Sequence, residues 1–209
     1  MRQVLLYILL ITTLTSSAQP SKYEKDLTTA VVSFYQMTTV ESYELAFKRF
    51  ELISNTNPND WIPAYYASMI KIKMCLSKMG DQEQLADAGL YWIAKCKKIQ
   101  LNDEVYCAES MAYTAKMSIR PTARWLLYEN KIKAPLELAK KINPKNPRIY
   151  TLQANLVYRM PSLFGGGCKA ALPLAKKAEK LLLEQGTPIS NLPHWGGQAI
   201  RELLKACPL

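Results

Sequence analysis

A four-residue motif that returns at a fixed interval decides the fold: NPND at residues 57–60, QLND at residues 100–103 and NPKN at residues 143–146. Each copy begins 43 residues after the previous one. The same offset aligns the pairs Lys73-Met74, Lys116-Met117 and Arg159-Met160, and it aligns Lys97-Lys98-Ile99 with Lys140-Lys141-Ile142. Several coincidences at one offset indicate an internal repeat, so the chain is expected to stack similar units.

Between the motifs, apolar residues recur at three- and four-residue spacing, and no stretch alternates with period two, which is the pattern of helices. We therefore expect an all-α fold, an α-solenoid of about four antiparallel helix pairs with a C-terminal capping helix. The expected helices span 21–37, 40–55, 61–79, 82–99, 103–119, 121–142, 147–160 and 166–185, and the cap spans 193–206.

The first residues have the features of an export signal. Arg2 supplies a positive charge, VLLYILLI at residues 4–11 is an apolar run, and Ser16-Ser17-Ala18 offers small residues for cleavage. The run is too short for a bilayer, which needs about 20 residues. We expect residues 1–18 to be a signal peptide and 19–209 to be a single domain, exported to the periplasm or the medium, with no transmembrane span in the mature chain. An uncleaved N-terminal anchor is the alternative.

Composition excludes several classes of protein. With 49% hydrophobic residues and 21% charged residues, the chain is neither disordered nor collagen-like. A single histidine, His194, leaves little room for histidine-based catalysis or zinc binding. No catalytic or metal-ligating set of residues is found, so we expect no enzyme activity, cofactor or metal. The net charge of +10 would suit nucleic acid, but an exported chain without a nucleic-acid-binding motif argues against that partner.

The repeat resembles the tetratricopeptide-repeat superfamily. The resemblance rests on Tyr43-Glu44-Leu45-Ala46 and Phe50 in one helix, Asn57-Pro58 at its end, and Ala64 and Ala67 in the next helix. Residues 164–167 (FGGG) and 169–172 (KAAL) are also similar to a segment of small exported bacterial repeat proteins, some of them T-component-like periplasmic proteins of tripartite transporters. The resemblance implies a binding surface built from stacked helices.

Five residues are the candidates for that surface: Tyr66, Lys73, Tyr113, Lys116 and Arg159. The three cations share one repeat position, so stacking would align them in a column. The preferred hypothesis is a scaffold module in the cell envelope that binds a protein or peptide partner, and the cationic column would suit an acidic one. A solvated face without a partner is the alternative for the cations. The alternative function is a periplasmic small-ligand-binding protein associated with transport.

Cysteine spacing leads to a disulfide hypothesis. Cys96 and Cys107 are level on successive antiparallel helices, and so are Cys168 and Cys207. Cys75 and Cys96 would be offset by roughly 15 Å along the helix axes, which is too far for a bridge. We expect the bridges Cys96–Cys107 and Cys168–Cys207 with Cys75 free. Buried, reduced cysteines are the alternative.

Overall fold

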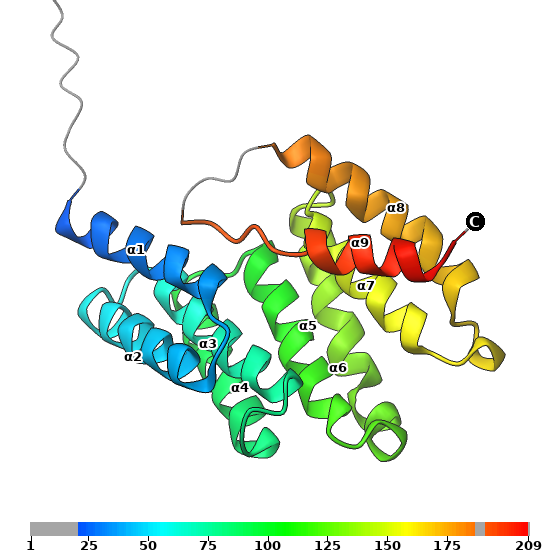
Figure 1. Ribbon diagram of the computed structural model, residues 1–209, viewed down its shortest axis with the longest axis horizontal. Helices are drawn as coiled ribbons and strands as arrows, with labels where there is room; N and C mark the ends of the chain where they lie inside the picture. Colours follow the sequence, from blue (N-terminus) through cyan, green and yellow to red (C-terminus); the bar gives the residue numbers. More distant parts are fainter. Residues whose placement is uncertain (1–20, 187–190, 209) are drawn as a thin grey trace, which may run out of the picture.

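The computed structural model describes residues 21–186 and 191–208, and this part of the chain consists of helices and loops (Figure 1). The α-helices are α1 (Lys22–Gln36), α2 (Val40–Thr56), α3 (Trp61–Leu76), α4 (Gln82–Ile99), α5 (Asp103–Ser118), α6 (Pro121–Ile142), α7 (Pro147–Arg159), α8 (Cys168–Gln185) and α9 (Gly197–Ala206). A short 3₁₀ helix, η1 (Ser162–Phe164), lies between α7 and α8. The expected signal peptide, residues 1–18, lies outside the described residues.

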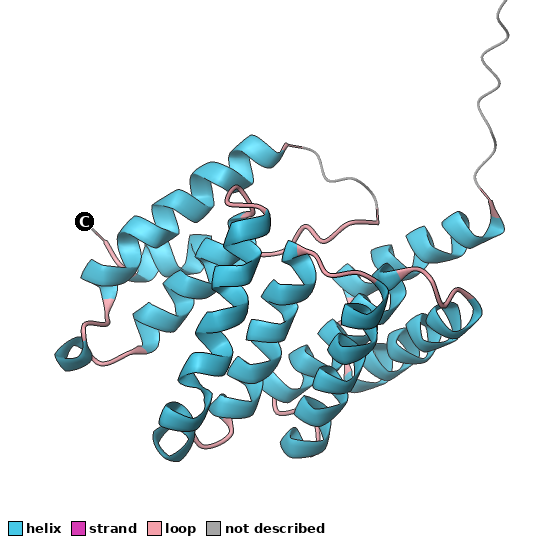
Figure 2. Cartoon of the chain, turned by 180° about the vertical axis from the view of Figure 1, so that it is seen from behind, coloured by secondary structure: helices cyan, strands magenta, loops and turns pink. Residues whose placement is uncertain are grey.

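The predicted all-α fold is confirmed: Figure 2 shows no strand in the described part of the chain. The helices form four consecutive pairs, α1–α2, α3–α4, α5–α6 and α7–α8, and α9 packs on α7 and α8. The largest difference from the expected helix boundaries is at the last helix, because α9 begins at Gly197 rather than at Pro193. Residues 191–196 instead form an extended strap, whose contacts with α1 and α3 are described below. Among the other boundaries, α3 ends at Leu76 rather than at residue 79.

The repeated motif separates one helix pair from the next and starts the first helix of each new pair. Asp60, Asn102 and Asn146 are the N-caps of α3, α5 and α7. Their side chains accept hydrogen bonds from backbone amides of the first turn, which would otherwise lack partners at a helix start. The N-cap is the fourth residue of the first and third copies of the motif and the third residue of the second copy. The motif therefore recurs because each copy starts a helix.

Small residues let the two helices of a pair approach closely. In the second pair, Ser68 Oγ of α3 donates a hydrogen bond to the Gly89 carbonyl of α4 at 2.9 Å. In the third, Ser110 Oγ of α5 donates to the Ile132 carbonyl of α6 at 2.8 Å. A Cβ atom at Gly89 would lie only 2.9 Å from Ile72 Cγ1, so this position needs a glycine for close packing.

The first helices of the pairs form a continuous layer, whereas the second helices are spread apart. α1, α3, α5 and α7 contact one another in succession. Within the described chain, the backbones of α2, α4, α6 and α8 do not approach one another closely, and only side chains connect neighbours among them, such as Arg124 of α6 with Glu83 of α4. As a result, α4 and α6 flank α5 with a gap between them, and part of α5 remains accessible there.

None of the described helices is both long and apolar enough to cross a bilayer.

Candidate functional site

The predicted column of cations does not form one accessible surface. Lys73 is half-buried, with Nζ 4.7 Å from the ring centroid of Phe34 on α1 and 5.9 Å from that of Tyr43 on α2. Burial lowers the pKa of Lys73. Arg159, at the end of α7, is exposed. Lys73 and Lys116 thus contact the preceding helix pair, whereas Arg159 is left exposed.

Lys116 takes part in an ion-pair network that joins α4, α5 and α6. Its Nζ lies 3.0 Å from Glu83 Oε2, and it also pairs with Asp87. Arg124 of α6 pairs with the same Glu83. Burial opposes protonation of Lys116, but its hydrogen bonds to Asp87 and Glu83 raise the pKa of Lys116. Hydrogen bonds from Arg124 and Lys116 hold the pKa of Glu83 at about 2. Lys116 therefore connects helices of the solenoid.

Tyr66, the aromatic candidate on α3, belongs to the core. Its side chain is fully buried, and its ring packs 4.9 Å from the Phe34 ring and 5.1 Å from the Phe50 ring. Burial and the neighbouring Tyr35 raise the pKa of Tyr66. No hydrogen-bond partner for its hydroxyl lies among the described residues. A partner molecule could not reach this side chain.

Tyr113, in contrast, lines an open groove between α4 and α5 of about 250 Å³. The other lining residues are Leu90, Ile93, Ala94 and Lys97 of α4 and Glu109 of α5. Lys97 Nζ pairs with Glu109 Oε1 at 2.8 Å and makes one end of the groove polar. Because the two helices are antiparallel, Leu90 and Tyr113 lie toward the other end, which is apolar and aromatic.

Side chains of α6 continue this aromatic end. The rings of Tyr113 and Tyr128 are 6.2 Å apart. Lys131 Nζ lies 5.8 Å from the Tyr113 ring centroid and 5.4 Å from that of Tyr128. Lys131 is exposed, so its charge is available to a ligand that lies on the two rings. We call the lining residues, together with Tyr128 and Lys131, the α4–α5 groove.

The groove offers few ligands for a metal. No histidine, cysteine or methionine lines it, and its one carboxylate, Glu109, is bound by Lys97. Within residues 21–186 and 191–208, no cluster of three or more His, Cys, Asp or Glu side chains could hold an ion. Any ligand of this groove would be held by apolar contact, aromatic stacking and the lysine charges.

A second hollow, of about 430 Å³, lies at the loop between α2 and α3 and is polar and open. Tyr23 of α1 donates a hydrogen bond there to Asp60, and burial together with this bond raises the pKa of Tyr23. The remaining lining comes from residues 56–59. The side chains of Tyr23 and Asp60 already bond to each other, so they are not free to bind a ligand in this hollow.

The strap of residues 191–196 covers part of the layer of first helices, a feature that sequence reasoning missed. Thr28 Oγ1 bonds to Asn191 Oδ1 at 3.0 Å. The His194 ring stacks on Tyr35 at 3.9 Å between centroids. Trp195 Nε1 donates to the Tyr65 hydroxyl at 2.8 Å. His194 is thus in contact with α1, and the strap covers this side of α3.

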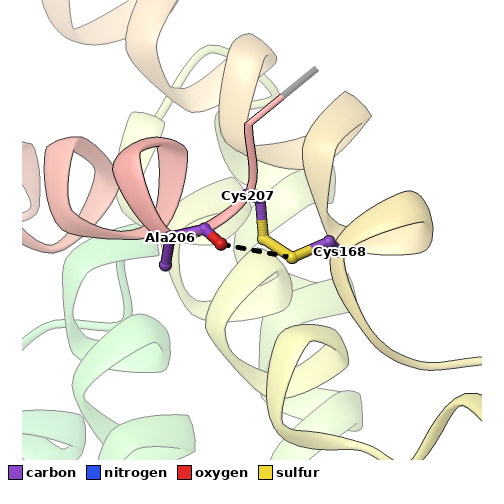
Figure 3. The surroundings of a disulfide bond; sticks show 3 residues. All are labelled: Cys168, Ala206 and Cys207. Atoms are coloured by element: carbon purple, nitrogen blue, oxygen red, sulfur yellow. Dashed lines mark hydrogen bonds between the residues drawn. A yellow bond between two sulfur atoms is a disulfide. The ribbon is translucent and has the colours of Figure 1, made fainter.

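Two of the five cysteines form a disulfide (Figure 3). Cys168, at the start of α8, is bonded to Cys207, just after α9, with their Cα atoms 5.3 Å apart. Cys75, Cys96 and Cys107 are free and buried. The expected bridge between Cys96 and Cys107 is wrong. The two residues are level along their helices, but Cys96 points into the core cluster of α1–α5 and Cys107 into that of α5–α9.

A buried charged cluster ties α5 to α7. Arg148 Nε donates to Glu104 Oε1 at 2.6 Å, and Asn146 Nδ2 donates to the same oxygen at 2.7 Å. Oε2 of Glu104 is buried without a partner among the described residues. Burial raises the pKa of Glu104, and the charge of Arg148 opposes this shift. The sequence showed Glu104 only as an acid in a first helical turn, where the helix dipole would explain it.

The fold and the groove define an all-helical repeat protein with an open, largely apolar groove. No protein-family model matches the chain, and no curated protein matches it. Among solved structures, the chain is similar to the HusA haemophore from Porphyromonas gingivalis. The two are 29% identical with a TM-score of 0.80, over 88% of this chain and 92% of the other.

This similarity corrects the expected function. A scaffold module that binds a protein or peptide partner is wrong, because the similar structure is that of a haemophore. The alternative, a small-ligand-binding protein, fits the comparison better. The tetratricopeptide-repeat resemblance stays a prediction, since no family model matches.

Proposed function

We propose that the chain is an exported small-ligand-binding protein that carries haem or a related porphyrin in the α4–α5 groove. The observation that carries the proposal is the similarity to a haemophore over most of both chains. The groove supports it, because a porphyrin is a flat, apolar ring with carboxylate side chains. Such a ligand needs an apolar wall, an aromatic surface and nearby cations.

The groove can supply each of these contacts. Leu90 and Ala94 offer an apolar wall in front of the buried Ile93, and Tyr113 offers an aromatic face at its end. Lys131, which lies over the rings of Tyr113 and Tyr128, is placed to pair with a carboxylate. Apolar lining with a few oriented polar groups is the general character of small-molecule sites.

The size of the groove favours partial burial of the ligand. Its volume of about 250 Å³ is below the roughly 300–1,000 Å³ of enclosed small-molecule pockets. One edge or face of a porphyrin would therefore contact protein while the rest remains accessible. Such a site suits a carrier that releases its ligand to another protein.

Binding in this groove would depend on the ring more than on the iron. The lining contains none of the side chains that usually ligate haem iron apart from the phenol of Tyr113. His194 is in the strap, where its Nδ1 lies 3.1 Å from the Leu192 carbonyl oxygen. An iron-free porphyrin is therefore expected to bind about as well as haem.

Export is part of the proposal. It is supported by the expected signal peptide and by the Cys168–Cys207 disulfide, because disulfides persist mainly in oxidising compartments outside the cytoplasm.

The test is a titration of residues 19–209 with haem and with iron-free protoporphyrin, followed by porphyrin absorbance and tryptophan quenching. Tyr113→Ala should weaken the binding of both ligands by about tenfold, since stacking on the ring contributes about 1 kcal/mol in addition to the burial of apolar surface. Tyr91→Ala is the matched control, because Tyr91 is exposed on α4 outside the groove lining. Lys131→Ala should weaken binding, and Lys133→Ala, whose lysine pairs with Glu129, should not.

Two outcomes would contradict the proposal. One is the lack of a saturable signal change with either ligand at stoichiometric protein, which would exclude porphyrin binding. The other is haem binding that Tyr113→Ala and Tyr91→Ala alter equally, which would exclude the groove as its site.

A further inference from the structure

The loop between α7 and α8 exposes two large apolar side chains. Leu163 is 87% exposed and Phe164 is 70% exposed. Both belong to η1, and Figure 1 shows this loop at the edge of the molecule, beyond the ends of α7 and α8. The two side chains are adjacent in the sequence, and contiguous exposed apolar surface can mark an interaction site.

The loop is built to hold these side chains outward. Backbone hydrogen bonds join Phe164 N to Pro161 O at 2.9 Å and Gly167 N to Val157 O at 3.0 Å. A Cβ atom at Gly166 would lie 2.1 Å from the Met160 carbonyl oxygen, so only glycine permits this close approach. Cys168 follows directly and is fixed by the disulfide. Leu163 and Phe164 therefore project from a braced turn.

The surrounding part of the chain is strongly cationic. No Asp or Glu occurs between Glu137 and Glu179, whereas eight Lys and Arg residues do. Of these eight, only Arg148 forms an ion pair within residues 21–186 and 191–208. Arg159 and Lys169 are exposed at the two bases of the loop. The apolar pair thus sits between two cations that have no acidic partner in the described structure.

We propose that this apolar tip, Leu163 and Phe164 flanked by Arg159 and Lys169, docks the protein on the surface of an anionic lipid bilayer. The apolar pair enters the boundary between headgroups and acyl chains, and the two cations bind headgroup phosphates. A protein partner fits less well, because a stable protein interface buries about 800 Å² on each side, far more than two side chains provide. A bilayer surface demands no matching shape.

The test is sedimentation of residues 19–209 with vesicles of phosphatidylglycerol mixed with phosphatidylcholine, and with vesicles of phosphatidylcholine alone. The chain without residues 1–18 is used because their apolar run would itself bind lipid. The protein should bind the anionic vesicles and be released by salt. Leu163→Ser/Phe164→Ser should lower the vesicle partition constant by about tenfold or more. Arg159→Gln/Lys169→Gln should lower it by about tenfold.

Leu45→Ser/Leu52→Ser is the matched control. These leucines are 72% and 64% exposed on α2, next to Glu44 and Glu51, and their replacement should leave vesicle binding unchanged. All substituted side chains are exposed, so circular dichroism and thermal unfolding should match the parent protein.

Three results would overturn the proposal: no binding to anionic vesicles, equal binding to phosphatidylcholine alone, or equal losses in the tip and control variants.

Discussion

The buried pair of Glu104 and Arg148 allows a quantitative test of how α7 is attached to α5. Arg148 is 3% exposed and donates from Nε to Oε1 of Glu104, and its Nη2 forms an ion pair with the same oxygen. Replacing Arg148 with Met removes this charge-assisted hydrogen bond and the ion pair, and it leaves a buried carboxylate without its counter-charge. Removing one partner of such a pair costs about 3–5 kcal/mol. In a protein of this size, that loss lowers Tm by roughly 6–20 °C.

The double variant Glu104→Met/Arg148→Met should recover much of this loss. It leaves no buried charge at the pair, and Asn146 keeps its hydrogen bond to Asp103 Oδ2 at 2.8 Å. We expect the double variant to be destabilised by about 2 kcal/mol or less, because two apolar side chains can replace a buried ion pair at little cost. The assay is urea unfolding of the parent, both single variants and the double variant, analysed as a double-mutant cycle.

The pH dependence of Arg148→Met follows from the same carboxylate. Burial raises the pKa of Glu104 above its ordinary value of 4.5, and loss of Arg148 removes the charge that opposes this shift. A group with a raised folded-state pKa favours the folded protein when protonated, so its penalty appears as pH rises through that pKa. The destabilisation should therefore be largest at neutral pH and shrink toward pH 4.5. Additive losses in the cycle, or a loss independent of pH, would refute the reasoning.

Two further predictions concern the cysteines. The Cys168–Cys207 disulfide closes a segment of 39 residues. Its loss, by Cys168→Ser/Cys207→Ser or by a reductant added to the parent protein, should therefore lower the free energy of unfolding by about 4 kcal/mol. Urea unfolding measures this loss, and a reductant that leaves the unfolding of the parent protein unchanged would contradict the prediction. The three free thiols are buried, and burial raises the pKa of Cys96 to about 12. A thiol reagent at pH 8 should therefore label none of them in the native protein and all three in denaturant. Mass spectrometry can count the labels on each chain.

Repeat spacing predicted the helix order well, because the periodic motif supplies the N-caps that start α3, α5 and α7. It did not predict where side chains at equal repeat positions point. Lys73 and Lys116 face the preceding helix pair, where Lys73 lies near aromatic rings and Lys116 meets Glu83 and Asp87. Sequence register gives the position along a helix, whereas the neighbour met at that position depends on how the pairs are rotated against each other.

The candidate site was found only in part for the same reason. Tyr113 was identified from its register, but the other groove residues come mostly from α4 and α6, with Glu109 from α5, and share no repeat position with it. The expected Cys96–Cys107 bridge failed for the same reason. The sequence gives the position of each cysteine along its helix but not the direction of its side chain, and the two side chains point into different core clusters. The hydrophobic pattern of α4 could have placed Leu90 and Ile93 on one face of this helix. It could not have shown that α6 would leave a groove beside that face.

The proposed ligand groove and the apolar tip lie on different elements, which makes the two proposals separable. The groove is formed by α4, α5 and α6, and the tip is formed by the loop between α7 and α8. Because sites without shared partners act independently, Leu163→Ser/Phe164→Ser should bind porphyrin like the parent, and Tyr113→Ala should bind vesicles like the parent. Loss of both activities in either variant would instead mean that the substitution disturbs the fold, and neither loss could then be assigned to a site.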